Sequence, residues 1–248
     1  FVGAGPGDVD LITIKGRKLL EEADLVIYAG SLVSKEHLKF CKKGCKIYNS
    51  ASMTLEDVID KIGIATKKGL KVVRLHTGDP TIYGAIREQM DLLDNKGIDY
   101  EVIPGVSSFT AACCSIKKEF TLPEVSQTVI LTKIEGRTSV PEKEDLESLA
   151  AHRASMALFL SVKEIDRVVE KLKKGYGRED VPIAVVYKAT WKDEKIIIGT
   201  LKDIGERIEK AEITKTAQIL VGDFIEGEYE RSKLYNPNFS HEYRSGSK

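Results

Sequence analysis

The first residues that could do chemistry form a glycine-rich turn at residues 3–8, with the sequence GAGPGD. A strand followed by closely spaced glycines suggests a dinucleotide site, in which backbone amides hold a pyrophosphate at a helix N-terminus. Two residues disfavour this: Asp8 stands where the third glycine of that fingerprint belongs, and Pro6 has no amide donor. Two interpretations stay open. The glycines could simply permit a tight turn, or the loop could approach a bulky substrate and present the Asp8 carboxylate.

Two similar turns follow later predicted strands. Residues 77–84 read TGDPTIYG, and residues 104–108 read PGVSS. Either turn alone could be a helix cap, because Asp and Ser are good N-caps and Pro suits the first helical position. In open α/β sheets, however, ligands bind beyond the carboxyl ends of the strands. Three small-residue turns at successive strand ends therefore predict one shared crevice.

Metal, hydrolase and P-loop chemistry have little support in the sequence. Cys41 and Cys45 have no second cysteine pair at zinc spacing, and the four histidines are scattered. The sequence has neither the Gly-x-Ser-x-Gly elbow of hydrolases nor the Gly-Lys-Ser/Thr of P-loops. Cys113 and Cys114 lie among small residues and are expected to pack in a core. We therefore predict no metal site.

The composition limits the possible partners. Of the 248 residues, 42% are hydrophobic and 31% charged, which suits one or two compact domains. Lysines and arginines number 38, and so do acidic residues, so no net field attracts nucleic acid or anionic lipid. The apolar runs fall far short of the ~20 residues that a membrane span needs. We expect a cytoplasmic protein that binds neither nucleic acid nor membrane.

The first half of the chain alternates short apolar runs with amphipathic stretches, which predicts a largely parallel sheet covered by helices. Thr54 is the expected N-cap of one helix, because an acid, Asp57, follows three residues later. Strands are expected at 25–28, 46–48, 71–75 and 100–103, and helices at about 12–23, 35–42, 55–69 and 86–97.

The rhythm breaks at residues 117–127, where we place a domain boundary. Further strands are expected at 128–132, 155–160, 183–187, 195–199 and 218–221, with an amphipathic helix after the second of them. The short spacing around Trp191 predicts a hairpin and so a partly antiparallel second sheet. The predicted organisation is an N-terminal α/β domain (1–118), a C-terminal α/β domain (119–225) and a polar tail (226–248).

Taken together, the motifs resemble a known family. Residues 3–8, Tyr28 with 31–34 (SLVS), 78–84 and 104–108 occur in the order typical of tetrapyrrole (corrin/porphyrin) methylases. Those enzymes transfer methyl groups from S-adenosylmethionine to ring carbons, and the similarity extends over residues 1–225. Residues 131–141 (LTKIEGRTSVP) and 186–191 (VYKATW) resemble the branch that methylates C11 of precorrin-4 in cobalamin synthesis. The resemblance implies two α/β domains with the active site in the cleft between them, and a homodimer.

The resemblance also implies roles for individual residues. Asp8 matches an aspartate proposed as proton acceptor, whereas Gly30 stands where some relatives carry a basic residue. Positions that contact S-adenosylmethionine in the family fall here on Pro6, Thr77, Gly78, Asp79, Ile82, Tyr83, Ser107, Ser108, Leu160, Ala189 and Ala217.

The substrate of such an enzyme carries many carboxylates, yet this chain is neutral overall. A local basic rim is therefore expected, since Lys and Arg pair with carboxylates. The candidates are Lys15, Lys133, Arg137 and Lys188, although Lys133 and Arg137 could equally lie in a solvated surface loop.

Other functions stay open at this point. The chain could methylate another ring position, such as C2 and C7 of uroporphyrinogen or C17 or C20 of a precorrin. It could also bind S-adenosylmethionine or a tetrapyrrole without catalysis. A nicotinamide oxidoreductase is the third alternative, disfavoured by Pro6 and Asp8.

Overall fold

The computed structural model describes residues 1–136 and 138–246 and divides into two compact units. The first unit comprises Phe1–Ala111 together with Lys188–Asp193. The second comprises Ala112–Tyr187 and Glu194–Lys248. A short segment from the second half of the chain therefore belongs to the first unit. The predicted boundary at 118/119 stays a prediction.

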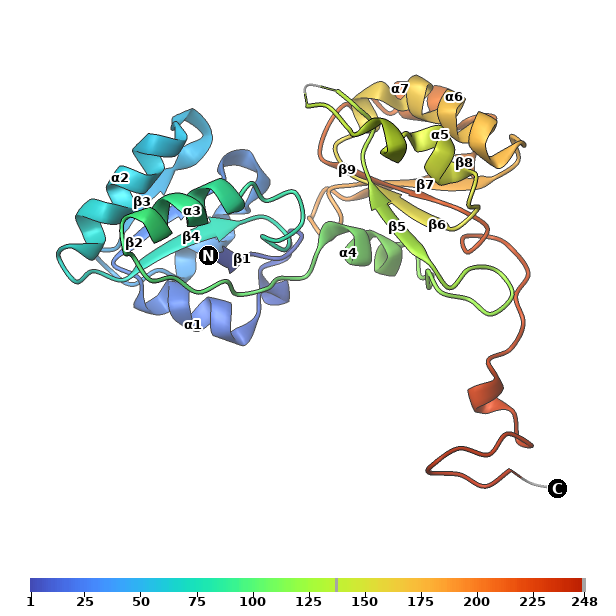
Figure 1. Cartoon of the computed structure of the whole chain (residues 1–248), viewed down its shortest axis with the longest axis horizontal. Coiled ribbons are helices and arrows are strands. Elements are labelled where there is room, and N and C mark those ends of the chain that lie inside the picture. The colour runs from blue at the N-terminus through green and yellow to red at the C-terminus, as the bar shows by residue number, and fades with distance from the viewer. Residues whose placement is uncertain (137, 247–248) are drawn as a thin grey trace. The chain divides into compact units, whose positions relative to one another are not determined.

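The first unit is built on a parallel sheet with the strand order β1-β4-β2-β3 (Figure 1). Its strands are β1 (Val2–Gly3), β2 (Leu25–Tyr28), β3 (Lys46–Asn49) and β4 (Val72–His76). Its helices are α1 (Ile14–Glu22), α2 (Leu55–Thr66) and α3 (Arg87–Asn95), with short 3-10 helices η1 (Val9–Leu11), η2 (Gly30–Leu32), η3 (Lys35–Phe40) and η4 (Ser50–Ser52). Helix α4 (Ser108–Ser115) contains the division between the units.

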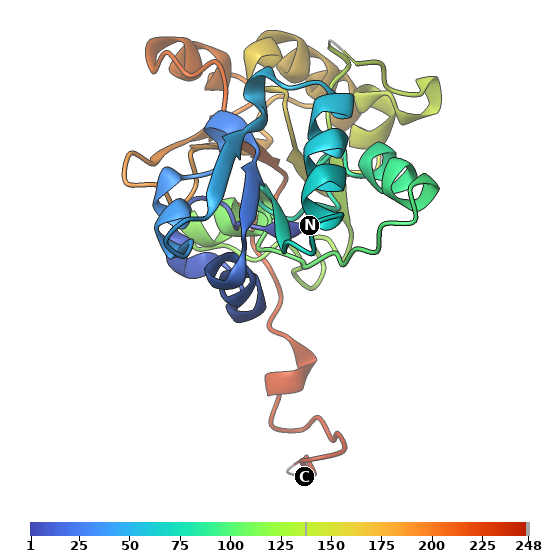
Figure 2. The same cartoon turned by 90° about the vertical axis from the view of Figure 1, so that its left-hand side faces the viewer.

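Alternate residues of each strand enter two separate cores. Val26 and Tyr28 pack with Leu20 of α1 on one face of the sheet. Leu25 and Ile27 pack on the other face, in a cluster that includes Ile59 of α2. Figures 1 and 2 show α1 and α2 on opposite sides of these strands. The buried strands thus explain why the sequence shows continuous apolar runs here.

One charged side chain is buried under α3. Arg74 of β4 is 9% exposed, donates from Nε to Gln89 Oε1 (3.2 Å) and from a guanidinium nitrogen to the Ile27 carbonyl (3.1 Å). Burial lowers its pKa to about 10. Because Gln89 lies on α3, these bonds attach that helix to the sheet.

Several predicted elements of the first unit are confirmed, and others differ. Thr54 and Asp57 form a capping box at the start of α2, as the sequence predicts. Residues 100–103, however, form no strand of the sheet, because only an isolated bridge joins Ile103 to Val2. The helix expected at 35–42 is the 3-10 helix η3, which ends at Phe40.

The second unit contains a mixed sheet with the order β5-β6-β9-β7-β8. Strands β5 and β6 are parallel, whereas β9, β7 and β8 add in antiparallel fashion. The hairpin predicted around Trp191 is confirmed, with Tyr187 opposite Lys195. The strands are β5 (Val129–Thr132), β6 (Ser155–Leu158), β7 (Pro182–Tyr187), β8 (Lys195–Thr200) and β9 (Ala217–Val221).

Three helices pack against this sheet (Figure 1). They are α5 (Leu146–Ala150), α6 (Ile165–Tyr176) and α7 (Ile204–Lys210), with 3-10 helices η5 (Glu142–Glu144) and η6 (Val162–Glu164) between elements. Their apolar sides form one core with Met156, Ile183 and Ile219 from the strands.

In α4, Cys113 is buried but Cys114 is exposed, so the predicted packing role fits only Cys113.

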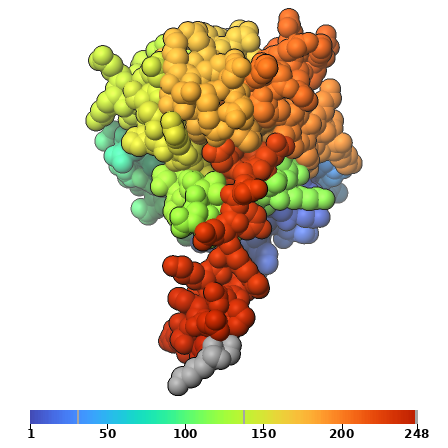
Figure 3. Space-filling model, turned by 90° about the vertical axis from the view of Figure 1, so that its right-hand side faces the viewer, coloured from blue at the N-terminus to red at the C-terminus, as the bar shows by residue number. Residues whose placement is uncertain are grey.

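The residues that follow the second unit's core contain little regular structure. Within 226–246 there is one short 3-10 helix, η7 (Lys233–Tyr235), and most side chains are exposed. Figure 3 shows much of this red segment at the surface. Among the residues that the structure describes, none of the helices has both the length and the apolar composition required to cross a bilayer.

Two helix-interior glycines provide a test of the packing. A Cβ on Gly63 of α2 would meet only Ile98 Cδ1 at 3.9 Å, so Gly63→Ala should stabilise the protein by about 0.5–1 kcal/mol through backbone entropy. A Cβ on Gly175 of α6 would lie 2.3 Å from the Glu147 carbonyl oxygen, so Gly175→Ala should destabilise by about 1–3 kcal/mol. Urea unfolding followed by circular dichroism measures both, and shifts of the same sign would contradict the two packing environments.

Candidate functional site

Three loops come together at the carboxyl ends of the parallel strands. The turn after β1 is joined to the turn after β4, because Gly78 N donates to Gly5 O (2.8 Å) and Gly5 N to Gly78 O (3.3 Å). Gly3 N donates to the Ile103 carbonyl (3.1 Å), which brings residues 104–108 to the same edge. The structure therefore brings together the three turns that the sequence analysis singled out.

Asp79 links two of these turns through its side chain. Its Oδ1 accepts from Thr81 N (2.8 Å) and Thr81 Oγ1 (2.5 Å), while its Oδ2 accepts from Gly105 N (3.0 Å). Burial raises the pKa of Asp79, but the bonds from Thr81 and Gly105 outweigh it, so the net shift is downward. Asp79 caps a turn here, since the next helix, α3, begins only at Arg87. Both carboxylate oxygens are thus committed to the protein.

The glycines of these turns are required by backbone packing. A Cβ on Gly105 would lie 2.2 Å from the Gly78 carbonyl oxygen, and one on Gly3 would lie 2.6 Å from the same atom. Gly78 itself has φ +57°, which side chains rarely adopt. The interpretation that the glycines permit tight turns therefore has a physical basis. Three backbones approach one another too closely for any side chain.

The first turn is also contacted from the β7–β8 connection. Trp191 Nε1 donates to the Pro6 carbonyl (2.8 Å), and Asp8 N donates to Thr190 Oγ1 (3.0 Å). A Cβ on Gly7 would lie 2.1 Å from Trp191 Cδ1, so the indole packs directly on that glycine. The sequence predicted the hairpin but not this contact, because local periodicity carries no information about a partner about 185 residues away.

Asp8 is the exposed carboxylate of the site. Its Oδ1 accepts from Asp10 N (3.0 Å), which caps the 3-10 helix η1. This bond orients the side chain at the edge of the turn. Among the described residues, no second turn donates a hydrogen bond to the Asp8 carboxylate, whereas Asp79 accepts one from Gly105.

The other predicted cofactor positions differ in exposure. In the first unit, Ser107 and Ala189 are buried, Thr77 and Ile82 are half-buried, and Ser108 starts α4. Tyr83 is 45% exposed and has φ +53°. The remaining two positions lie in the second unit: Leu160 follows β6 and Ala217 begins β9.

Tyr83 in the first unit and Leu160 in the second share a strained backbone and an exposed side chain. Leu160 is 72% exposed and has φ +55°, so both residues present apolar surface from a backbone conformation that costs energy. The donor and acceptor atoms of the turns are backbone groups and serines, which suits the polar parts of a nucleoside.

Two of the four basic candidates lie in the first unit, and each has an acidic partner. Lys15 forms an exposed ion pair with Glu101 (2.8 Å). Lys188 pairs with Asp193 (2.6 Å), and its ammonium lies 5.4 Å from the Trp191 ring centroid. Lys133, in the second unit, donates to the Thr138 carbonyl (3.0 Å). Arg137 lies outside the described residues.

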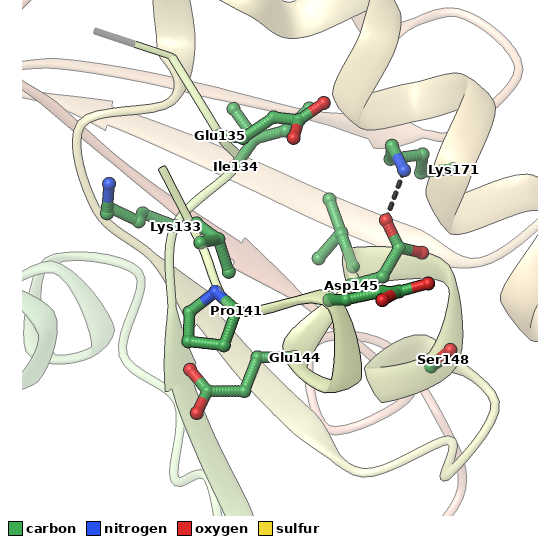
Figure 4. A pocket seen from close by; sticks show the side chains of 11 residues that line it. Lys133, Ile134, Glu135, Pro141, Glu144, Asp145, Ser148 and Lys171 are labelled. Atoms are coloured by element: carbon green, nitrogen blue, oxygen red, sulfur yellow. Dashed lines mark hydrogen bonds and ion pairs between the residues drawn. The ribbon is translucent and has the colours of Figure 1, made fainter. Parts of the chain in front are cut away.

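A cavity of about 580 Å³ lies in the second unit (Figure 4). Four carboxylates line it, from Glu135, Glu142, Glu144 and Asp145, against the ammonium groups of Lys133 and Lys171. Lys171 pairs with Asp145 and lowers the pKa of that carboxyl. The excess of negative charge makes this cavity a poor site for a ligand with many carboxylates.

A buried histidine in the strand that leads to the site was not singled out by the sequence. His76 ends β4, is 4% exposed, and its Nε2 has no hydrogen-bond partner among the described residues. Burial, with the positive charge of Arg74, lowers its pKa to about 3. The imidazole is therefore neutral beneath the turns. Its burial follows from its place in the central strand β4, which no motif marked.

The Asp79 bonds predict how stability depends on pH. Because the folded-state pKa is lowered, this contribution is complete above the unfolded pKa of about 3.9 and is lost as pH falls through the folded value. Asp79→Asn should cost about 1 kcal/mol at pH 7, a value reduced for solvent exposure, since one acceptor and the charge are removed. The difference from wild type should shrink below pH 4 in urea unfolding. The exposed carboxylate of Asp99 provides the control Asp99→Asn, and an equal pH response in both variants would contradict the role of Asp79.

With this geometry established, comparison with known proteins becomes informative. The family model of Tetrapyrrole (Corrin/Porphyrin) Methylases matches residues 1–205. The cobalt-precorrin-4 C(11)-methyltransferase of Methanocaldococcus jannaschii is 60% identical over 249 residues, covering 100% of this chain and 96% of the relative.

Solved structures share the predicted mixed α/β fold, which is thereby confirmed. A cobalt precorrin-4 methyltransferase has a TM-score of 0.89 at 48% identity, covering 91% of this chain and 94% of that one. Uroporphyrin-III C-methyl transferase from Thermus thermophilus, complexed with S-adenyl homocysteine, has a TM-score of 0.73 at 25% identity, covering 91% and 92%. This chain therefore belongs to the tetrapyrrole (corrin/porphyrin) methylase family.

Proposed function

We propose that this chain is an S-adenosylmethionine-dependent C-methyltransferase that converts (cobalt-)precorrin-4 to (cobalt-)precorrin-5 by methylating C11, in cobalamin biosynthesis. The observation that carries this proposal is the 60% identity, over the full chain, to a relative named for that reaction. The structural likeness to a cobalt precorrin-4 methyltransferase, at TM-score 0.89, supports the same assignment.

Methyl transfer from sulfur sets particular demands on the protein. S-adenosylmethionine supplies a methyl group that is already activated on a sulfonium. The protein therefore has to hold the ring carbon in line with it, which is worth on the order of 10⁵ M or more in effective molarity. As the positive charge disappears in the transition state, a nearby unpaired carboxylate would stabilise the reactant instead.

The turns at residues 3–8, 77–83 and 104–108 suit these demands. Both oxygens of Asp79 are bound within the protein, so its charge organises the turns at residues 77–83 and 104–108. The neighbouring groups are backbone carbonyls, glycines and serines, which carry no net charge. The exposed Asp8 carboxylate is the group on this loop that can accept a proton from the methylated ring.

The basic rim for the substrate carboxylates stays part of the proposal. Lys15 and Lys188 are held in exposed ion pairs with Glu101 and Asp193. Such pairs contribute little to stability, about 0–1 kcal/mol, so each lysine can exchange its partner for a substrate carboxylate. Lys133 and Arg137 are the other two candidates.

Other ring positions are less well supported. A relative named for uroporphyrinogen-III is 32% identical, whereas one named for C11 of cobalt-precorrin-4 is 60% identical. A non-catalytic binder of S-adenosylmethionine or a tetrapyrrole would share the fold but transfer no methyl group. Cytoplasmic location and a homodimeric state also belong to the proposal; the first rests on the sequence composition and the second on the family resemblance.

Incubation with methyl-labelled S-adenosylmethionine and cobalt-precorrin-4 tests the function. We expect one labelled methyl group per ring by mass spectrometry and its placement at C11 by NMR. Methylation at another carbon would replace the assigned position, and binding of both compounds without transfer would establish the carrier instead. Metal-free precorrin-4 in parallel shows which form of the ring is used.

Asp8→Asn tests the proposed proton acceptor. Asn is as good an N-cap as Asp, so η1 should remain folded while the basic oxygen is lost. We expect kcat to fall by about 10²–10⁴-fold, with unchanged calorimetric affinity for S-adenosylhomocysteine. Asp10→Asn removes a neighbouring exposed carboxylate and serves as the matched control. Equal activity of the two variants would reduce Asp8 to a capping residue.

A further inference from the structure

The chain has one tryptophan, Trp191, and it lies against the glycine-rich turn of residues 3–8. It is half-buried and belongs to the segment Lys188–Asp193, which joins β7 to β8 yet forms part of the first compact unit. It contacts backbone groups of the turn, and it belongs to neither of the two core clusters formed by Val26 with Leu20 and by Ile27 with Ile59 among the described residues. Ordinary core packing therefore does not explain its position.

Three contacts join the two segments. The indole Nε1 donates to the Pro6 carbonyl at 2.8 Å, and Thr190 Oγ1 accepts from Asp8 N at 3.0 Å. Between them, Gly7 leaves just the space that the indole occupies, since a Cβ would lie within 2.1–2.8 Å of three ring atoms. Pro6, Gly7 and Asp8 are thus each contacted by a different part of residues 190–191.

The segment that presents Trp191 is itself strained. Lys188 and Thr190 have φ values of +48° and +70°, a region that non-glycine residues adopt at a cost. The Trp191 amide closes the turn by donating to the Lys188 carbonyl (2.9 Å), and the Lys188 ammonium lies over the indole ring. A strained backbone persists only where surrounding contacts hold it, and here the contacts with residues 6–8 do so.

We propose that Trp191 is a positioning residue of the methyl-transfer site, acting through the Pro6 carbonyl and the adjoining Gly7–Asp8 backbone. This inference rests on the proposed function. Trp191 fixes the path of the turn, and the Thr190 hydroxyl fixes the amide of Asp8 itself. Together they set the direction of the Asp8 carboxylate, whose own hydrogen bond among the described residues is from Asp10 N in the same turn. Displacement of such a group by about 1 Å costs up to 10²-fold in rate.

A double-mutant cycle between positions 7 and 191 tests the coupling. Gly7 is not in the left-handed region, so an alanine there is opposed chiefly by the indole. Gly7→Ala should lower kcat about 10–100-fold and lower the melting temperature by a few degrees in the wild-type background. In the Trp191→Ala background, the same change should alter kcat by less than about twofold. Equal losses in both backgrounds would overturn the proposal.

A milder variant separates positioning from folding. Trp191→Phe keeps a ring against Gly7 but removes the Nε1–H donor, and Thr190→Val removes the acceptor for Asp8 N. Each should lower kcat about 3–10-fold with a smaller change in KM for the tetrapyrrole. The matched control is Thr66→Val, which removes a hydroxyl bonded to the Ile62 carbonyl on α2 and should leave kcat unchanged. Wild-type kcat in Trp191→Phe would contradict the positioning role.

The single tryptophan provides a readout that does not depend on activity. Titration with S-adenosylhomocysteine should change the emission of Trp191, and Gly7→Ala should weaken that binding in the wild-type background only. If the wild-type protein transfers no methyl group, the proposed function fails, while this titration and the melting temperatures still decide the coupling. Binding with no change in emission, together with independent effects at positions 7 and 191, would overturn the inference alone.

Discussion

The close approach of three backbones at Gly3, Gly78 and Gly105 is the constraint on which the site depends. The Gly78 carbonyl oxygen would lie 2.6 Å from a Cβ on Gly3 and 2.2 Å from one on Gly105, too close for either. Such contact is possible only without side chains, so the turns after β1, after β4 and after Ile103 can share one edge. The Asp79 carboxylate then accepts a hydrogen bond from Gly105 N across this contact. Because the acceptor is charged, this bond is a strong one and holds the two backbones together.

This arrangement places two carboxylates, Asp79 and Asp8, in different environments, although the sequence alone does not distinguish them. Asp79 stabilises the turns, because both of its carboxylate oxygens accept hydrogen bonds from the protein. Asp8 stays at the surface of its turn, with one bond that caps a single turn of 3-10 helix. This division suits a methyl transfer, because hydrogen bonds hold the charge of Asp79 within the scaffold while the exposed Asp8 carboxylate is the proposed proton acceptor. The chemistry of the family is therefore consistent with the burial and bonding of these two residues.

Much of the fold follows from local pattern, since it is specified by neighbours in sequence. Thr54 and Asp57 predict the start of α2, and the short spacing around Trp191 predicts the β7–β8 hairpin. The prediction of a strand at 100–103 was wrong, because Ile103 pairs with β1 at a single isolated bridge. How many backbone pairs a segment forms with a neighbouring strand depends on tertiary structure. The contact of Trp191 with Pro6 is likewise long-range.

The candidate site divides in the same way. The strand-end rule correctly groups the turns at 3–8, 77–84 and 104–108. The spacing of residues could not show that the glycines allow one another's backbones to approach closely. Nor could it show that both Asp79 carboxylate oxygens accept hydrogen bonds, or that His76 is buried and neutral. The ligand roles of all the cofactor positions, Leu160 and Ala217 among them, come from family resemblance and stay predictions.

The most direct measurement is a crystal structure of the protein with S-adenosylhomocysteine. The account predicts density for the ligand against the turns at 3–8, 77–83 and 104–108, with contacts to Pro6 and Ser107 and with the Asp79–Gly105 bond intact. Density in the acidic cavity beside Lys171, with the strand-end turns empty, would contradict it.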